Sequence, residues 1–132
     1  MANINFNNRD PIYLQLIDYF RRMLVSNQLS LGEELQSRRQ IARQFNINPN
    51  TVQRAFSEME ENRWIYTEPN RPSRVTEDPR MLDNIKQEFV ENAVKEFVNS
   101  IQMIDITYEE VADLLAKEIE SQNKSNGGNQ DD

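Results

Sequence analysis

Apolar residues in the first part of the chain recur at intervals of three and four positions, the spacing of one face of an α-helix. Asp10-Pro11 opens the first such stretch, and an aspartate cap followed by a proline is a typical helix start. The predicted helix ends before Leu31-Gly32. Its buried stripe comprises Tyr13, Leu16, Ile17, Phe20 and Leu24.

Two shorter helices are predicted next. Ser37 and Gln40 have the spacing of a capping box, which predicts a helix of two or three turns with a short apolar face formed by Ile41, Ala42 and Phe45. Asn46 is the connector residue best suited to a left-handed conformation. Asn48-Pro49 then predicts the start of a third helix, whose apolar stripe is Val52, Ala55, Phe56 and Met59.

This arrangement is typical of a helix-turn-helix, although an ordinary helical hairpin has the same spacing. The following residues favour the first interpretation. Residues 64–67 are β-branched or aromatic, 69–72 have the composition of a turn, and 73–76 can return as a second strand. Residues 1–76 are therefore predicted to form a winged helix-turn-helix, with three helices and a β-hairpin wing.

The rest of the chain predicts two more helices. Asp78-Pro79 repeats the cap-plus-proline start, and Thr107 with Glu110 forms a second capping box. A single amphipathic helix of about six turns cannot bury its own apolar stripe, so residues 77–120 are expected to form a two-helix dimerisation domain. Residues 121–132 are polar and contain glycine, and a disordered tail is expected there. The predicted fold class is mainly α.

The composition excludes several classes of function. The chain contains no cysteine and no histidine, so disulfides, thiol or imidazole catalysis and most zinc sites are absent. Glu109, Glu110 and Asp113 are better explained as a solvated helix start than as metal ligands. We expect no enzyme activity, no metal site and no cofactor. With neither a membrane-spanning apolar run nor a signal-peptide pattern, a cytoplasmic protein without membrane association is expected.

The charge is divided unevenly along the chain. The net charge is −7, which by itself argues against a nucleic-acid ligand. Residues 1–76, however, carry ten arginines against eight acidic residues, a net charge of +2. Residues 77–132 carry five basic against fourteen acidic residues, a net charge of −9. The first part is thus compatible with double-stranded DNA as a partner.

Several short motifs in residues 10–76 resemble the DNA-binding domain of the GntR family of bacterial regulators. They are Pro11-Ile-Tyr-Leu-Gln-Leu16, Leu29-Ser-Leu-Gly-Glu-Glu-Leu35, Ser37-Arg-Arg39, Ile41-Ala42 and Asn50-Thr-Val-Gln-Arg-Ala55. The short helical remainder resembles the YtrA subfamily, whose two C-terminal helices dimerise and are too small for a large effector pocket. The resemblance implies a repressor that binds a palindromic operator as a homodimer and controls a transporter operon.

The chain departs from the family pattern mainly at turns. Gln36 replaces the usual proline before the second helix, and Asn46, Arg63, Asn70 and Pro72 stand where the family usually has glycine. Arg63 in a left-handed cap costs about 1 kcal/mol, and a wing without glycine approaches a minor groove less closely. Loss of these glycines also leaves an alternative function open, a degenerate winged helix that binds a protein partner instead of an operator.

In a winged helix the third helix enters the major groove, with its N-terminal residues at the base edges. Asn and Gln there can pair with adenine and Arg with guanine, while arginines of the second helix and the wing can reach phosphates or a narrow minor groove. The resemblance implies roles for Arg39 and Thr51 in particular. The predicted DNA-binding residues are Arg38, Arg39, Arg43, Asn48, Asn50, Thr51, Gln53, Arg54, Arg71 and Arg74.

The C-terminal apolar stripes are expected to form a core shared between two chains rather than a ligand pocket. The predicted dimerisation residues are Leu82, Ile85, Phe89, Phe97, Ile101, Leu114 and Leu115.

Overall fold

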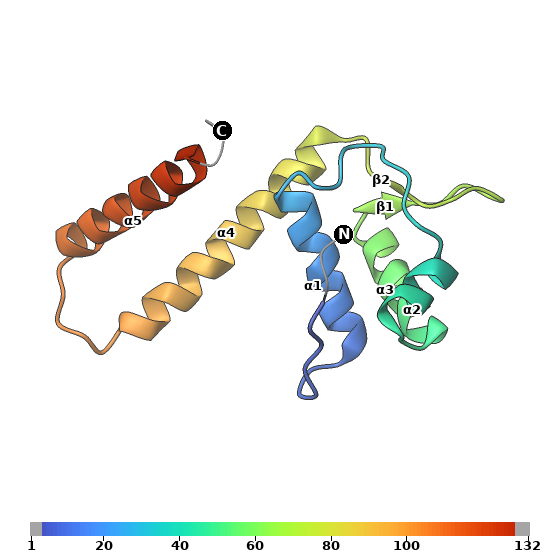
Figure 1. Ribbon diagram of the computed structural model, residues 1–132, viewed down its shortest axis with the longest axis horizontal. Helices are drawn as coiled ribbons and strands as arrows, with labels where there is room; N and C mark the ends of the chain where they lie inside the picture. Colours follow the sequence, from blue (N-terminus) through green and yellow to red (C-terminus); the bar gives the residue numbers. More distant parts are fainter. Residues whose placement is uncertain (1–3, 129–132) are drawn as a thin grey trace. The chain divides into compact units, whose positions relative to one another are not determined.

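The computed structural model describes residues 4–128, and it confirms a mainly helical winged-helix fold (Figure 1). Three helices come first, followed by a two-stranded antiparallel hairpin and two longer helices. Their bounds are α1 Ile12–Val25, α2 Arg38–Phe45, α3 Pro49–Glu61, β1 Ile65–Tyr66, β2 Arg74–Val75, α4 Pro79–Ile101 and α5 Tyr108–Gly128.

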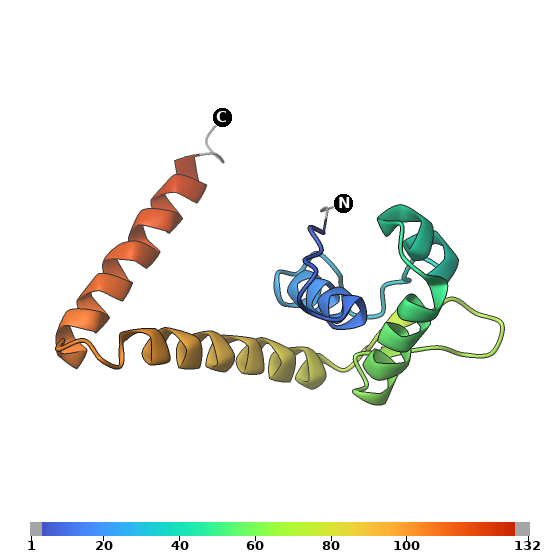
Figure 2. The same cartoon turned by 90° about the horizontal axis from the view of Figure 1, so that it is seen from below.

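Helix α3 lies at the centre of the winged helix and packs against α1, α2 and β1. Figures 1 and 2 both show α1 and α3 side by side, with α2 against α3. All four residues of the predicted α3 stripe are buried, and Phe56 is completely enclosed. The ring of Phe20 from α1 meets that of Phe56 edge-on, with 5.8 Å between ring centroids. The apolar patterns of the first three helices therefore predict the core correctly.

The sequence signals at the helix ends hold, with one correction. The capping box of Ser37 and Gln40 forms in full, Asn46 adopts φ 53°, and the side chain of Asn48 accepts a hydrogen bond from the Asn50 amide. Asp10, however, does not cap α1, which begins one residue later with Pro11 at the N-cap position. Proline has no polar side-chain atom, so the helix start has no side-chain cap. Asp10 lies outside the helix, and its backbone carbonyl accepts a hydrogen bond from the Gln15 side chain.

The wing is a short hairpin in which Ile65 pairs with Val75 and Tyr66 with Arg74. An isolated bridge between Glu34 and Arg74 ties the segment before α2 to the second strand. In both views the loop that joins the strands extends away from α1 (Figures 1 and 2). Both strands are two residues long, shorter than the predicted segments, because the turn residues leave the ladder early.

The first turns of α4 belong to the winged helix. Leu82 and Ile85 are 9 % and 3 % exposed and join the core around Phe56. They were predicted to mediate dimerisation, and that prediction is wrong, because their side chains already fill a core within the chain. The chain divides into Met1–Val94 and Lys95–Asp132, so the boundary falls inside α4 rather than at residue 76.

The apolar stripe of α4 is therefore two stripes on different sides of the helix. Beyond the buried residues, a second set recurs at intervals of three and four: Val90, Val94, Phe97, Val98 and Ile101. Most of its members are exposed, as are Leu114, Leu115 and Ile119 of α5. Among the described residues no apolar side chain beyond Ile85 is buried.

Helix α5 starts at the predicted capping box and continues further than expected. Thr107 Oγ1 accepts from the Glu110 amide, and the Glu110 carboxylate accepts from the Thr107 amide. A disordered tail from residue 121 was predicted, but α5 runs to Gly128. Side-chain pairs one turn apart, such as Lys124 with Glu120, support this polar segment. Residues 129–132, the rest of the predicted tail, lie outside the described range.

Arg63 provides a test of backbone strain. It follows α3 with φ 65°, the left-handed conformation that the sequence predicted to be unfavourable at this position. We expect Arg63→Gly to raise the free energy of unfolding by up to about 1 kcal/mol, because glycine adopts this conformation without strain. Thermal unfolding measures the change. Arg63→Ala is the control, since it removes the same side chain but keeps the strain; equal stability of both variants would contradict this account.

Candidate nucleic-acid interface

The basic surface of the winged helix comes from α2 and the start of α3. Residues 35–57 contain four arginines and no acidic residue, whereas Glu58, Glu60 and Glu61 follow at the far end of α3. The N-terminal end of α3 also carries the positive end of the helix dipole. A phosphate backbone is therefore attracted to this end of the helix and repelled from the other.

The start of α3 presents polar side chains to solvent. Asn50, Gln53 and Arg54 are exposed and Thr51 is half-buried. Their exposure follows from the burial of the neighbouring Val52 and Ala55, which fixes the rotation of the helix. Asn48 uses its side-chain oxygen as the cap, and its two amide hydrogens can still donate to another partner. The exposed set retains donors and acceptors suited to base edges.

Arg54 is held by an aromatic residue from α1. Its guanidinium carbon lies 3.8 Å from the ring centroid of Tyr13, and its Nη2 donates to Tyr13 Oη at 3.2 Å. Tyr13 and Arg54 line a shallow hollow with Ile12, Asn50 and Thr51. A guanidinium held in this way loses less side-chain freedom on binding than a free one. Tyr13 was predicted only as a core residue, so its place beside Arg54 is a finding of the structure.

The three arginines of α2 have different environments. Arg39 and Arg43 are exposed on the helix surface. Arg38 is half-buried, and its Nη2 donates to Glu60 Oε1 at 2.9 Å. An arginine already paired with a carboxylate offers little net charge to a phosphate. Arg39 and Arg43 therefore remain the predicted contacts from α2, whereas the structure argues against Arg38.

The two wing arginines also differ. Arg71 is exposed in the loop between the strands. Arg74 is half-buried, and its Nη1 donates to the Gly32 carbonyl at 3.0 Å, which ties β2 to the segment before α2. Next to it in the ladder, Tyr66 donates to Glu77 Oε1 at 2.9 Å, and this hydrogen bond raises the pKa of Tyr66. Arg71 is thus the wing arginine with its charge most available to DNA.

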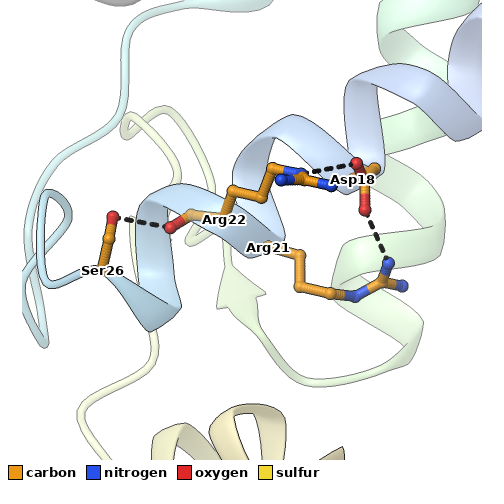
Figure 3. A network of polar contacts seen from close by, with 4 residues as sticks. All are labelled: Asp18, Arg21, Arg22 and Ser26. Atoms are coloured by element: carbon orange, nitrogen blue, oxygen red, sulfur yellow. Dashed lines mark hydrogen bonds and ion pairs between the residues drawn. The ribbon is translucent and has the colours of Figure 1, made fainter. Parts of the chain in front are cut away.

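The arginine pair of α1 serves the fold. Asp18 accepts from both Arg21, at 3.2 Å, and Arg22, at 2.9 Å (Figure 3). Arg21 also lies over the ring of Trp64, and Arg22 over that of Phe89. Neither arginine is in the predicted DNA-binding set.

Residues 4–128 contain no group of three or more acidic side chains arranged to hold a metal ion. No helix in that range is long and apolar enough to cross a membrane.

Known proteins resemble this chain over the winged helix and beyond it. The model of the family "Bacterial regulatory proteins, gntR family" matches residues 12–75. The chain is 33 % identical over 106 residues to an uncharacterized HTH-type transcriptional regulator, YhcF, of Bacillus subtilis, covering 80 % of this chain and 88 % of that protein. It is 26 % identical, over the full length of both chains, to the HTH-type transcriptional repressor YtrA of the same organism.

The solved structures show the same relationship. A GntR family transcriptional regulator from Listeria monocytogenes superposes with a TM-score of 0.79 at 28 % identity, over 85 % of this chain and 98 % of that one. The match includes the C-terminal helices as well as the winged helix, since it extends well beyond residues 12–75. The chain belongs to the gntR family of bacterial regulatory proteins and is a YtrA-like transcriptional regulator that binds DNA, not an enzyme.

Proposed function

We propose that the protein is a cytoplasmic repressor that binds a palindromic operator as a homodimer, and that this operator controls a transporter operon. The observation that carries the DNA-reading part of the proposal is the surface of α2 and the start of α3, where residues 35–57 contain no acidic residue and Asn50, Gln53 and Arg54 are exposed. The name of the full-length relative YtrA supports repression as the output.

The proposal assigns a DNA contact to each exposed polar residue at the start of α3 and to arginines of α2 and the wing. Asn50, Thr51, Gln53 and Arg54 read base edges in the major groove, and Tyr13 holds the guanidinium of Arg54. Arg39 and Arg43 bind phosphates or guanines beside the helix. Arg71 reaches the minor groove from the wing. Few phosphates are contacted, because the described surface offers only a handful of unpaired arginines, so the salt dependence of binding has a moderate slope.

Arg39→Ala tests the reading surface. We expect its affinity for a DNA duplex selected from a random library by the wild-type protein to fall about ten- to hundredfold, the effect of losing one specific arginine contact. Fluorescence anisotropy of the labelled duplex measures the loss. Arg80→Ala is the matched control, because Arg80 is an exposed arginine at the start of α4, outside the surface.

Equal affinities of the two variants would remove Arg39 from the interface. If the wild-type protein selects no duplex even at low salt, the operator-binding function itself is refuted and the alternative of a protein-binding winged helix is favoured.

Dimerisation is supported by the exposed apolar stripes of α4 and α5. Val94 and Val98 are 52 % and 51 % exposed, and Leu114 and Ile119 are both 59 % exposed. Beyond Ile85 neither α4 nor α5 has a buried apolar residue in the described range, and such amphipathic segments are not stable alone in water, because helix propensity by itself is too weak. A second copy of the chain offers the same stripes, and two-fold symmetric dimers are the commonest oligomers. The dimer also places two winged helices on two half-sites.

The predicted dimerisation residues Phe97, Ile101, Leu114 and Leu115 fit this proposal, since none is buried within the chain. Phe89 is half-buried beside Arg22, so it belongs at most to the edge of the interface.

Val94→Glu tests the dimer. A carboxylate placed in the centre of an apolar interface loses its hydration without gaining a partner, so we expect a monomer at concentrations where the wild-type protein is dimeric. Sedimentation velocity measures the mass. Asn99→Glu is the control, because Asn99 lies half a turn beyond Phe97 on the opposite side of α4 and is exposed. A dimeric Val94→Glu variant, or a wild-type protein that is monomeric, would contradict the proposal.

A further inference from the structure

A chain of polar contacts connects α2, α3 and both ends of the wing loop. Glu60 of α3 is its centre: Oε1 accepts from Arg38 Nη2 at 2.9 Å and from Thr67 Oγ1 at 2.7 Å. Thr67 Oγ1 in turn shares a hydrogen bond with Ser73 Oγ at 2.5 Å. Thr67 directly follows β1 and Ser73 directly precedes β2, so the contacts meet where the loop leaves the sheet.

The two ends of this chain of contacts are fixed by burial. The guanidinium carbon of Arg38 lies 4.8 Å from the ring centroid of Phe56, which is fully buried. The Nε of Arg38 is also buried, without a hydrogen-bond partner within residues 4–128. At the other end, Ser73 is 4 % exposed. The half-exposed Glu60 and the exposed Thr67 connect these two anchors.

The strands of the wing are held by the burial of Ile65 and Val75, but the loop between them depends on contacts at its base, because the ladder is small. Its sheet has two residue pairs, and a two-stranded hairpin of that size is not stable in water by itself. The loop at 67–73 contains no glycine, and Asn70 takes up the positive φ of 60°. The direction of the loop, and with it the position of Arg71, is therefore set by the contacts at its base.

We propose that Arg38, Glu60 and Thr67 are positioning residues, which hold the wing at the angle where Arg71 reaches DNA while α3 lies in the major groove. This inference rests on the proposed operator binding and deepens it. It gives Arg38 an indirect role, through Glu60, instead of the phosphate contact predicted from the sequence. It also gives Glu60 a function beside the wing, because Arg38 balances the charge of its carboxylate, which accepts a hydrogen bond from Thr67.

A double-mutant cycle tests the coupling between Glu60 and Arg71. In the wild-type background we expect Arg71→Ala to lower the affinity for the selected duplex about tenfold. In the Glu60→Ala background we expect the same change to lower the affinity by less than about threefold, because the released loop no longer brings Arg71 to DNA.

Glu61→Ala is the matched background, since it removes an equal charge from the adjacent, exposed position of α3. There the tenfold effect of Arg71→Ala is expected to persist. Circular dichroism and thermal unfolding of each variant confirm that it is folded at the temperature of the binding measurement.

Variants at Thr67 provide a second test that leaves all charges in place. Thr67→Val keeps the shape of the side chain and removes its hydroxyl. As in the Glu60→Ala background, we expect Arg71→Ala to lower the affinity for the duplex less in this variant than in the wild type. Thr67→Ser has the hydroxyl again, and in this variant we expect the full affinity loss on Arg71→Ala to return. A purely structural effect on the strand would not follow the hydroxyl in this way.

The outcomes separate this inference from the proposed function. A full effect of Arg71→Ala in the Glu60→Ala and Thr67→Val backgrounds would overturn it, as would no effect of Arg71→Ala in the wild type. In both cases binding of the selected duplex through α3 would still stand. Failure of the wild-type protein to select any duplex would refute the proposed function, and the inference with it.

Discussion

Burial of the apolar face of α3 is the constraint on which the rest of the winged helix depends. Phe56 lies at its centre, enclosed by Phe20 from α1 and covered by the guanidinium of Arg38 from α2. A helix whose rotation is fixed by one buried face has its opposite face fixed as well. The exposure of Asn50, Gln53 and Arg54 is therefore a consequence of packing. Packing of the core thus decides which side chains of α3 are exposed, and Tyr13 in addition holds the guanidinium of Arg54.

The distribution of charge fits the same division. Arginines are kept at the exposed surface of α2, α3 and the wing, whereas others are engaged by acidic residues of the chain, as Arg21 and Arg22 are by the single carboxylate of Asp18. The acidic residues that follow residue 76 give the C-terminal part a field that repels DNA. A net charge of −7 is thus compatible with DNA binding, because DNA responds to the charge of the local surface and not to the sum over the chain.

Features determined by local sequence were predicted well. The capping box at Ser37, the left-handed Asn46 and the cap at Asn48 each depend on a few neighbouring residues, and all three are present. Features that depend on packing between distant residues were missed. The α4 pattern reads as one continuous stripe, and only the fold shows that Leu82 and Ile85 bury in the chain's own core while Val94 stays exposed.

The same limit applies to the candidate site. Arginines and amides at the start of α3 can be assigned to a surface from helical periodicity alone. Periodicity does not predict which arginines already have a partner in the fold, because Glu60 lies 22 positions from Arg38 and Tyr13 lies 41 positions from Arg54. For the C-terminal segment the prediction assigned too little structure. The polar composition of residues 121–132 suggested disorder, but α5 continues to Gly128.

The central claim, that two winged helices read a symmetric operator, is tested most directly by footprinting the protein on the DNA upstream of its own gene. The account predicts two protected half-sites related by two-fold symmetry, with centres separated by one helical turn of about 10 base pairs or a multiple of it. Protection of a single half-site, or protection that does not distinguish this DNA from random duplex, would contradict it.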